Sequence, residues 1–190
     1  MEEAVTFRNP EEYEIGEIIL TDEQINQRIA ELAQDIATTH NGKQLLVVGL
    51  LKGGFRVTSD LVTQLHDKGL TDIEITFLKT KSYLDKTESQ QDPVITQDID
   101  VNPEGRHMLL VDDIADTGKS LKMVEENLSA RGAESITSFV LLDKPSRREV
   151  DFVPTYIGFT IPNIWVQGRG MDTNEKGRAD RHIRRGPYFI

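Results

Sequence analysis

The 190-residue chain contains no cysteine. Disulfide scaffolds, cysteine-ligated zinc sites, iron–sulfur clusters and thiol nucleophiles are therefore excluded. Aromatic residues make up only 6% of the chain, with a single Trp. No apolar run approaches the roughly 18 residues that a membrane helix requires. The stretch MEEAVTFRNPEE at the start is acidic and polar, unlike a secretory signal. These absences favour a cytoplasmic protein without a membrane partner.

The charge balance is acidic, with 22 basic and 32 acidic residues and a net charge of −10. Such a chain is not expected to bind nucleic acid over a broad surface. It can still hold an anion locally, because backbone N–H groups at a helix N-terminus bind phosphate whatever the net charge. Hydrophobic residues at 37% and charged residues at 28% are typical of a folded protein. The length predicts a single domain, 1–190.

Apolar runs of strand length alternate along the chain with stretches of helical periodicity. The expected strands are 45–51, 73–78, 107–111 and 136–142. The expected helices are 21–37, with Thr21 and Gln24 as a capping box, a second helix that ends before Gly69, and 119–131. The alternation predicts an α/β fold, an open and mostly parallel sheet flanked by helices.

The core of the predicted domain covers about 41–145. Short strands expected at 156–161 and 164–166 differ from the alternating pattern before them. We expect them to form a small hood subdomain with the N-terminal segment, from about 1–40 and 150–190. Between Ser82 and about Asp92 the chain is nearly all polar, which is typical of either a functional lid or a tolerated surface loop.

The stretch VDDIADTGKS, 111–120, follows an expected strand and opens an expected helix. Ligands of open α/β sheets bind at that end of the strands. Four successive residues there would present backbone N–H groups as a cradle for phosphate. They are Thr117, Gly118, Lys119 and Ser120. Gly118 allows close approach of the backbone, and the two hydroxyl groups add donors.

Three carboxylates belong to the same stretch. Asp112 and Asp113 suit a sugar diol or a Mg²⁺ ion, and Asp116 is placed to exchange a proton with a ligand. A Walker A loop is excluded because it requires Gly where the chain has Asp113. The alternative without function is a capped helix with solvated acids.

The same stretch resembles the phosphoribosyl pyrophosphate motif of the type I phosphoribosyltransferases. The rest of the chain resembles their hypoxanthine-guanine branch, in one register from about 14 to 180. The matching segments are Leu51-Lys52-Gly53-Gly54, Lys81-Ser82-Tyr83, Lys144 in LLDKPSRR, IPNIWVQGRGMD at 161–172, and Arg178. Five motifs in the same order are far more specific than any one of them.

This resemblance implies the type I phosphoribosyltransferase fold and a reaction of purine salvage. The family transfers the 5-phosphoribosyl group from phosphoribosyl pyrophosphate to N9 of a 6-oxopurine, and releases pyrophosphate and a nucleotide such as IMP or GMP. The implied partners are phosphoribosyl pyrophosphate and the 6-oxopurine bases, with Mg²⁺ as cofactor. A homodimer or homotetramer is a further expectation from the family.

The resemblance also implies roles at the sugar and pyrophosphate. Asp112 and Asp113 would hold the ribose hydroxyls, and the backbone of 116–120 would hold the 5′-phosphate. Lys52 and Gly53 would bind pyrophosphate through the backbone, and Arg178 would add positive charge there.

On the purine side, Asp116 would exchange the proton at N7. Lys144 would donate to the O6 oxygen, Trp165 would stack on the base, and the Val166 backbone would bind its edge. Asp172 would orient Mg²⁺, and the acidic pair on the sugar side is a further candidate for metal contact. The lid residues would be Ser82 and Tyr83.

Some residues depart from the pattern of the branch. The acidic pair is Asp112-Asp113, where Glu-Asp is usual. Gln167 and Arg169 replace residues that are usually apolar or aromatic. Arg169 would either add a cation that widens acceptance toward xanthine or face solvent. The C-terminal RADRHIRRGPYFI is unusually basic, and its arginines suit a subunit contact.

Two other readings stay open. The chain could be a regulator that senses phosphoribosyl pyrophosphate and binds nucleic acid, for which the basic cluster RHIRR at 181–185 is the one indication. It could also act on adenine or a pyrimidine, although the ammonium group of Lys144 cannot accept a hydrogen bond from an amino purine.

Overall fold

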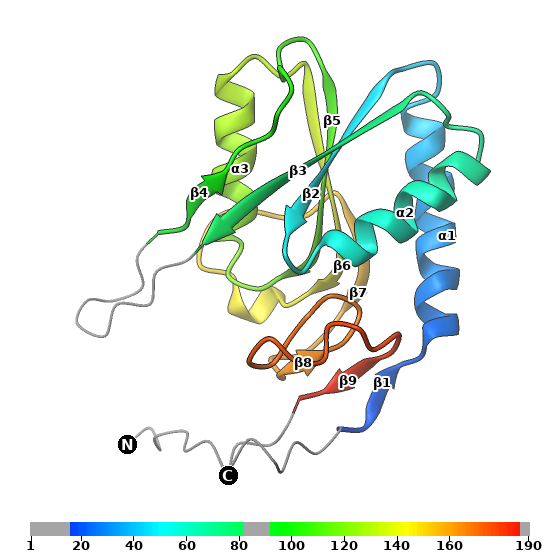
Figure 1. Ribbon diagram of the computed structural model, residues 1–190, viewed down its shortest axis with the longest axis vertical. Coiled ribbons are helices and arrows are strands. Elements are labelled where there is room, and N and C mark those ends of the chain that lie inside the picture. The colour runs from blue at the N-terminus through cyan, green and yellow to red at the C-terminus, as the bar shows by residue number, and fades with distance from the viewer. Residues whose placement is uncertain (1–15, 82–91, 187–190) are drawn as a thin grey trace.

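The computed structural model describes residues 16–81 and 92–186 and contains two sheets (Figure 1). The larger sheet has six strands in the order β4-β3-β2-β5-β6-β7. Their bounds are β2 Leu45–Leu51, β3 Ile73–Lys81, β4 Val94–Gln97, β5 His107–Ala115, β6 Ser135–Asp143 and β7 Tyr156–Thr160. All neighbouring strands are parallel except β4, which is antiparallel to β3. The predicted α/β class is confirmed.

Apolar side chains of the central strands alternate between two cores, one on each face of the sheet. In β2, Leu45 and Val47 belong to one buried cluster, and Leu46 and Val48 belong to the other. The continuous run LLVVGLL is therefore explained by burial on both faces, as is usual for parallel strands.

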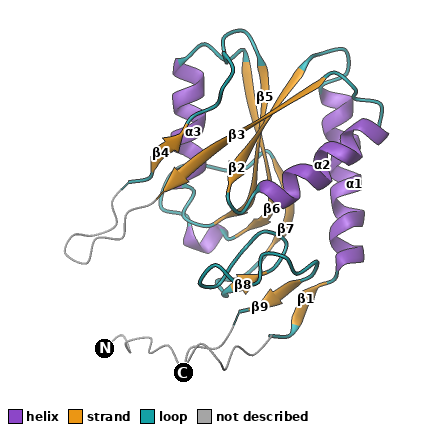
Figure 2. Ribbon diagram, in the orientation of Figure 1, coloured by secondary structure: helices purple, strands orange, loops and turns teal. Residues whose placement is uncertain are grey.

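Helices cover both faces of the larger sheet (Figure 2). Helices α1 (Asp22–Thr39) and α2 (Phe55–Asp67) pack on the first core, and α3 (Lys119–Ala130) packs on the second. The capping box at Thr21 is confirmed: its hydroxyl accepts from the Gln24 N–H, and the Gln24 side chain accepts from the Thr21 N–H. No helix among the described residues is long and apolar enough to span a membrane.

The smaller sheet pairs segments from the two ends of the chain. It contains β1 (Ile18–Leu20), β9 (Ile183–Arg185) and β8 (Val166–Gln167), in the order β1-β9-β8. This sheet and the loops between β7 and β9 lie beyond the carboxyl ends of the parallel strands (Figure 1). We call residues 16–20 and 161–186 the hood.

Two elements within the segments 1–40 and 150–190, which the sequence suggested for the hood, lie with the larger sheet. Strand β7 pairs in parallel with β6 in the larger sheet, and α1 packs against α2 and β7. The strand expected at 164–166 is observed at Val166–Gln167, where it pairs with β9. Strand β5 continues four residues beyond its predicted end at 111. Strands β1, β4 and β9 were not predicted.

Candidate active site

The candidate site lies where the parallel strands end. A loop at 52–54 follows β2, a turn at 116–118 follows β5, Lys144 follows β6, and the segment 161–165 follows β7. Because the carboxyl ends of parallel strands share one edge, these four loops converge there. Ser82 and Tyr83 follow β3 but lie outside the described residues, so the lid stays a prediction.

The acidic pair lies near the end of β5. The N–H of Asp113 donates to the Asp112 carboxylate at 2.9 Å. Burial, and then the charge of Asp113, raise the pKa of Asp112 well above its usual value. Burial also raises the pKa of Asp113, against the opposing charge of Arg178. The pair therefore favours a ligand that brings hydrogen-bond donors or positive charge.

The turn after β5 is the segment for which the sequence predicts a phosphate cradle. Gly118 has φ +83°, and a Cβ at this position would lie 2.7 Å from Cδ of Arg148, so the turn requires glycine. A hollow of ≈ 220 Å³ opens on this turn, lined by Asp112, Ile114, Ala115, Asp116, Thr117, Gly118, Ser120 and Leu121. The side chain of Lys119 is directed elsewhere and pairs with Glu149 at 2.9 Å.

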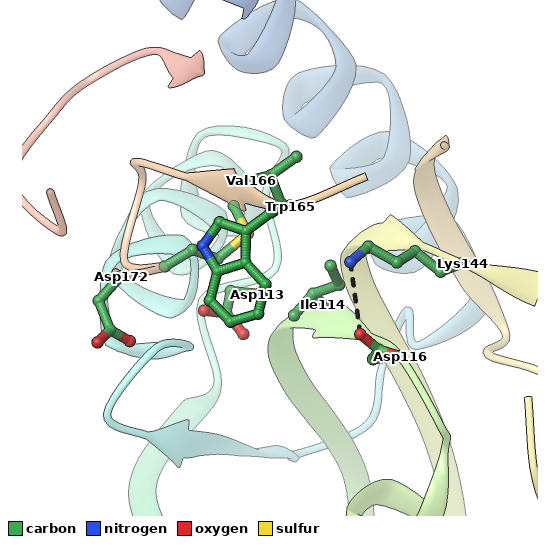
Figure 3. A pocket seen from close by; sticks show the side chains of 8 residues that line it. Asp113, Ile114, Asp116, Lys144, Trp165, Val166 and Asp172 are labelled. Atoms are coloured by element: carbon green, nitrogen blue, oxygen red, sulfur yellow. Dashed lines mark hydrogen bonds and ion pairs between the residues drawn. The ribbon is translucent and has the colours of Figure 1, made fainter. Parts of the chain in front are cut away.

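A second hollow, of ≈ 160 Å³, shares two lining residues with the first and so adjoins it. Figure 3 shows the second hollow. Its lining residues are Asp113, Ile114, Asp116, Lys144, Trp165, Val166, Met171 and Asp172. The hood contributes Trp165, Val166, Met171 and Asp172, and the larger sheet with its loops contributes the others. All four predicted purine-side residues therefore line one hollow, and Asp116 and Ile114 line both.

Asp116 is held by two cations. Its carboxylate accepts hydrogen bonds from Lys144 Nζ at 3.4 Å and from Arg147 Nε at 3.0 Å. Arg147 lies on a short 3₁₀ turn, Pro145–Arg147, that directly follows Lys144. Lys144 is only 5% exposed, so it is no solvated turn residue. The Asp116–Lys144 ion pair therefore lies within the second hollow (Figure 3).

Trp165 is not a core residue, because 54% of its surface is exposed. Its indole N–H donates to the Thr173 hydroxyl at 2.7 Å. A Cβ on Gly186 would lie 2.0 Å from the indole, so the ring packs directly against this glycine. These contacts orient an aromatic face at the edge of the hollow.

The loop after β2 links the two halves of the site. The Leu51-Lys52 peptide bond is cis. A Cβ on Gly53 would lie 1.9 Å from the Asp113 carboxylate, and a Cβ on Gly170 would lie 2.0 Å from the Gly53 carbonyl oxygen. Gly170 of the hood therefore packs on the loop, and Gly53 of the loop packs on the acidic pair. Both contacts require glycine, because a Cβ at either position would clash.

Arg178 lies on the hood side of this contact. It donates to the Gly170 carbonyl at 2.8 Å and pairs with Asp172 at 2.7 Å. The other carboxylate oxygen of Asp172 accepts from the Glu175 N–H at 2.8 Å. Across residues 16–81 and 92–186, no group of three or more His, Cys, Asp or Glu side chains is placed to hold a metal ion.

Comparison with known proteins decides the family. Residues 16–174 match the family model described as phosphoribosyl transferase domain. The hypoxanthine phosphoribosyltransferase of Haemophilus influenzae is 39% identical over 165 residues, which cover 85% of this chain and 90% of that protein. The chain belongs to the hypoxanthine-guanine phosphoribosyltransferase family. The hypoxanthine-guanine phosphoribosyltransferase of Staphylococcus aureus is 35% identical over 162 residues, covering 85% of this chain and 88% of that one.

Solved structures of the same family share the fold. A hypoxanthine phosphoribosyltransferase from Staphylococcus aureus superimposes with a TM-score of 0.84 at 34% identity, over 91% of this chain and 92% of that one. A hypoxanthine-guanine phosphoribosyltransferase from Bacillus anthracis, with HEPES in its active site, gives a TM-score of 0.85 at 32% identity, over 92% of this chain and 100% of that one. The type I phosphoribosyltransferase fold inferred from the motifs is confirmed.

In this phosphoribosyltransferase, Arg169 does not face solvent, so that expectation was wrong. It also does not line the second hollow. Its side chain is buried and pairs with Asp22 of α1 and with Asp60 of α2, the latter at 2.9 Å. It also donates to Asn26 and to the Arg181 carbonyl. Its guanidinium group therefore ties the hood to two helices. Gln167 is likewise buried, in β8.

The basic cluster at 181–185 includes the hood strand β9. Arg184 pairs with Asp180 at 2.6 Å and donates to the Gly16 carbonyl. The positive charge of Arg184 is therefore neutralised within the hood, and this gives no support to the nucleic-acid-binding alternative.

Sequence reasoning missed two apolar lining residues of this phosphoribosyltransferase site, Ile114 and Met171. Ile114 lies inside the recognised motif, and its position between two aspartates on a strand end was the available indication. Met171 lies beside Asp172 but carries no chemistry of its own. Arg147, the second cation on Asp116, was also missed, because its role depends on the 3₁₀ turn that follows Lys144.

Proposed function

We propose that the protein is a purine salvage pentosyltransferase that joins the phosphoribosyl group of phosphoribosyl pyrophosphate to N9 of hypoxanthine, guanine or xanthine. One observation supports this most strongly. Two adjoining hollows share Asp116; the first contains the glycine turn at the start of α3, and the second contains Lys144 and Trp165. A phosphorylated sugar in the first and a flat base in the second would meet at that carboxylate.

The sugar side follows from the donors and acceptors available. The turn at 116–120 would hold the 5′-phosphate through backbone N–H groups at the start of α3. The two ribose hydroxyl groups would donate to Asp112 and Asp113, whose carboxylates are withdrawn from water and favour such donors. Gly53 lies against Asp113, so pyrophosphate bound by the 52–53 backbone would adjoin the ribose.

Bond cleavage places opposite charges on the two products. Positive charge develops on the ribose as its bond to pyrophosphate lengthens, as in glycoside cleavage. Negative charge develops on the pyrophosphate, where Arg178 and the 52–53 loop would stabilise it. The incoming N9 then bonds to the sugar carbon, and Asp116 takes or returns the proton at N7 of the base.

Specificity for the base would come from a few polar contacts. Lys144 would donate to O6, and it would be left facing another donor if the base carried a 6-amino group. Trp165 would stack on the base, and the Val166 backbone would bind its edge. A buried donor without an acceptor costs free energy, so oxo purines should be preferred over adenine.

The carboxylates also suit Mg²⁺. Asp112 and Asp113 are adjacent, half-buried and buried respectively, and their raised pKa values mean that a nearby cation would be favourable. Asp172, which lines the second hollow with Asp113, would contact the ion partly through water. Mg²⁺ commonly takes only one or two ligands from carboxylates and the rest from phosphates and water, which fits a site without a three-ligand cluster. When bound, it would neutralise charge on the pyrophosphate group.

An assay of pyrophosphate release tests the proposal. The purified protein is mixed with phosphoribosyl pyrophosphate, Mg²⁺ and one base at a time: hypoxanthine, guanine, xanthine or adenine. We expect turnover with at least one oxo purine and little with adenine. Absence of turnover with all three oxo purines would refute the proposal, and equal turnover with adenine would refute the role of Lys144.

A further inference from the structure

Glu175 has an unusual backbone conformation beside the proposed pyrophosphate subsite. Thr173 and Lys176 exchange two backbone hydrogen bonds of 3.0 Å, which close a two-residue hairpin turn. Its central residues, Asn174 and Glu175, have φ values of +52° and +63°. This is the type I′ pattern, whose second central position strongly favours glycine. Glutamate breaks a local preference here, and such violations in proteins are concentrated at functional sites.

The Glu175 carboxylate contacts two cations at once. One oxygen, Oε2, lies 3.1 Å from Lys52 Nζ and 3.2 Å from Arg178 Nη2. Hydrogen bonds, first from Lys52 and then from Arg178, lower the pKa of Glu175, so the carboxylate is charged at neutral pH. Lys52 and Arg178 come from the two segments that our proposed function assigns to pyrophosphate.

We infer that Glu175 is an internal counter-anion of the pyrophosphate subsite, which neutralises Lys52 and Arg178 in the free enzyme and is displaced when pyrophosphate or its ribosyl ester binds. This inference rests on the proposed function. It makes Glu175 a determinant of affinity at this subsite: its carboxylate competes with the leaving group and so weakens retention of pyrophosphate.

The local contacts allow such a displacement. The backbone of Glu175 is anchored, because its N–H donates to the Asp172 carboxylate at 2.8 Å. Its side chain, in contrast, is 65% exposed and can leave by rotation about its own bonds. Arg178 keeps its contacts to Asp172 and Gly170 when Glu175 departs. The turn therefore holds the carboxylate at the subsite without fixing it there.

Titration calorimetry with pyrophosphate at constant Mg²⁺ tests the inference. The variant Glu175→Gln keeps the size of the side chain and removes its charge. We expect it to bind pyrophosphate about 3- to 10-fold more tightly than the wild type, because two partly exposed ion pairs no longer have to be broken. The gain should shrink as salt rises. The KM for phosphoribosyl pyrophosphate should fall in parallel.

Two further variants make the result specific. Glu126→Gln removes the same charge from an exposed side chain on α3, 3.9 Å from Lys122 and remote from the subsite, and should leave the affinity unchanged. Glu175→Gly relieves the positive φ and should also tighten binding. A purely structural role for Glu175 predicts the opposite, since loss of its contacts would disorder Lys52 and Arg178 and weaken binding.

The outcomes separate the two levels of the argument. Unchanged or weaker binding by Glu175→Gln, with normal binding by the wild type, would overturn the inference and leave the proposed function intact. Failure of the wild-type protein to bind pyrophosphate at all would remove the proposed function and the inference with it.

Discussion

Replacement of Arg169 by Met should destabilise the protein strongly and loosen the hood. The side chain of Arg169 is only 2% exposed, and its guanidinium group contacts Asp22 and Asn26 of α1 and Asp60 of α2. Both helices pack on the larger sheet. The substitution fills a similar space with apolar atoms, but it leaves two carboxylates without their shared cation. Removal of one partner from a buried ion pair is costly because the remaining charge stays poorly hydrated.

The magnitude follows from the burial of the acids. Breaking a fully buried pair costs about 3–5 kcal/mol. The side chains of Asp22 and Asp60 are 28% and 25% exposed, and Asp60 keeps a second partner in Arg56 at 3.4 Å. Because water and Arg56 recover part of the loss, we expect about 2–3 kcal/mol of lost unfolding free energy. For a domain of this size, the melting temperature should fall by about 4–12 °C.

Urea unfolding measures this loss, and the single tryptophan adds a local probe. Trp165 lies in the hood, so its emission reports on the hood, whereas far-ultraviolet circular dichroism is dominated by the helices. In the wild type the two transitions should coincide. In Arg169→Met the emission change should occur at lower urea, because the hood has lost its ion pairs to α1 and α2.

Two controls define the test. Arg56→Met removes the other partner of Asp60. Because the Arg56 side chain is 35% exposed, this change should cost less than about 1 kcal/mol of unfolding free energy. Arg169→Lys keeps the charge but loses the two-pronged contact, and should lie between Met and wild type. If Arg169→Met were no less stable than Arg56→Met, the reasoning that this buried arginine secures the hood would be refuted.

Three further predictions concern single residues. Asp116→Asn should lower kcat by about 10²–10⁴ while binding of phosphoribosyl pyrophosphate persists, measured by steady-state kinetics and calorimetry; unchanged kcat would exclude Asp116 from proton transfer. Gly170→Ala should weaken pyrophosphate binding at least about tenfold, since its Cβ would strike the Gly53 carbonyl at 2.0 Å, whereas Gly105→Ala, also at positive φ but with open space around it, should leave binding intact. Burial, and then the charge of Lys43, lower the pKa of His40 below its usual 6.5, so the unfolded chain binds a proton at this histidine before the folded chain does. The contribution of neutral His40 to the unfolding free energy is therefore present above about pH 6.5. It is lost as the pH falls, by at most about 1.4 kcal/mol per pH unit. Urea titrations between pH 7 and pH 5 should show a shallower loss for His40→Phe than for wild type, and identical slopes would contradict the assignment.

The larger sheet was predictable because its determinants are local. Each parallel strand is a short apolar run, and each helix has an apolar stripe with an identifiable start or end. The end of β5 was not predictable in this way. Asp112 and Ala115 extend the strand because they pair with Val140 and Asp143 of β6. The acidic pair interrupts the apolar run, so hydropathy alone does not reveal that the backbone ladder continues past it.

In the candidate site, too, the residues that could be predicted are those whose positions follow from nearby sequence. The acidic pair, the turn at 116–118 and Lys144 lie directly after buried strands, so the chain order places them at one edge of the sheet. Arg169 and Glu175 were missed because their partners are distant: Arg169 meets Asp22 and Glu175 meets Lys52, across 147 and 123 residues of chain. No local pattern distinguishes an arginine that bridges two helices from one that faces solvent.

The hood shows why these distant contacts are important for function. Its strands are only two or three residues long, and a sheet of that size has little stability of its own. Its position must therefore come from other contacts. These include the burial of Val166, Met171 and Ile183 in the first core, the Arg169 ion pairs at α1 and α2, and the packing of Gly170 on Gly53. Gly53 in turn touches Asp113, so the same contacts that secure the hood also set the position of its hollow-lining residues relative to the acidic pair. A substitution that loosens the hood should therefore lower affinity for base and pyrophosphate together, even where it touches neither ligand.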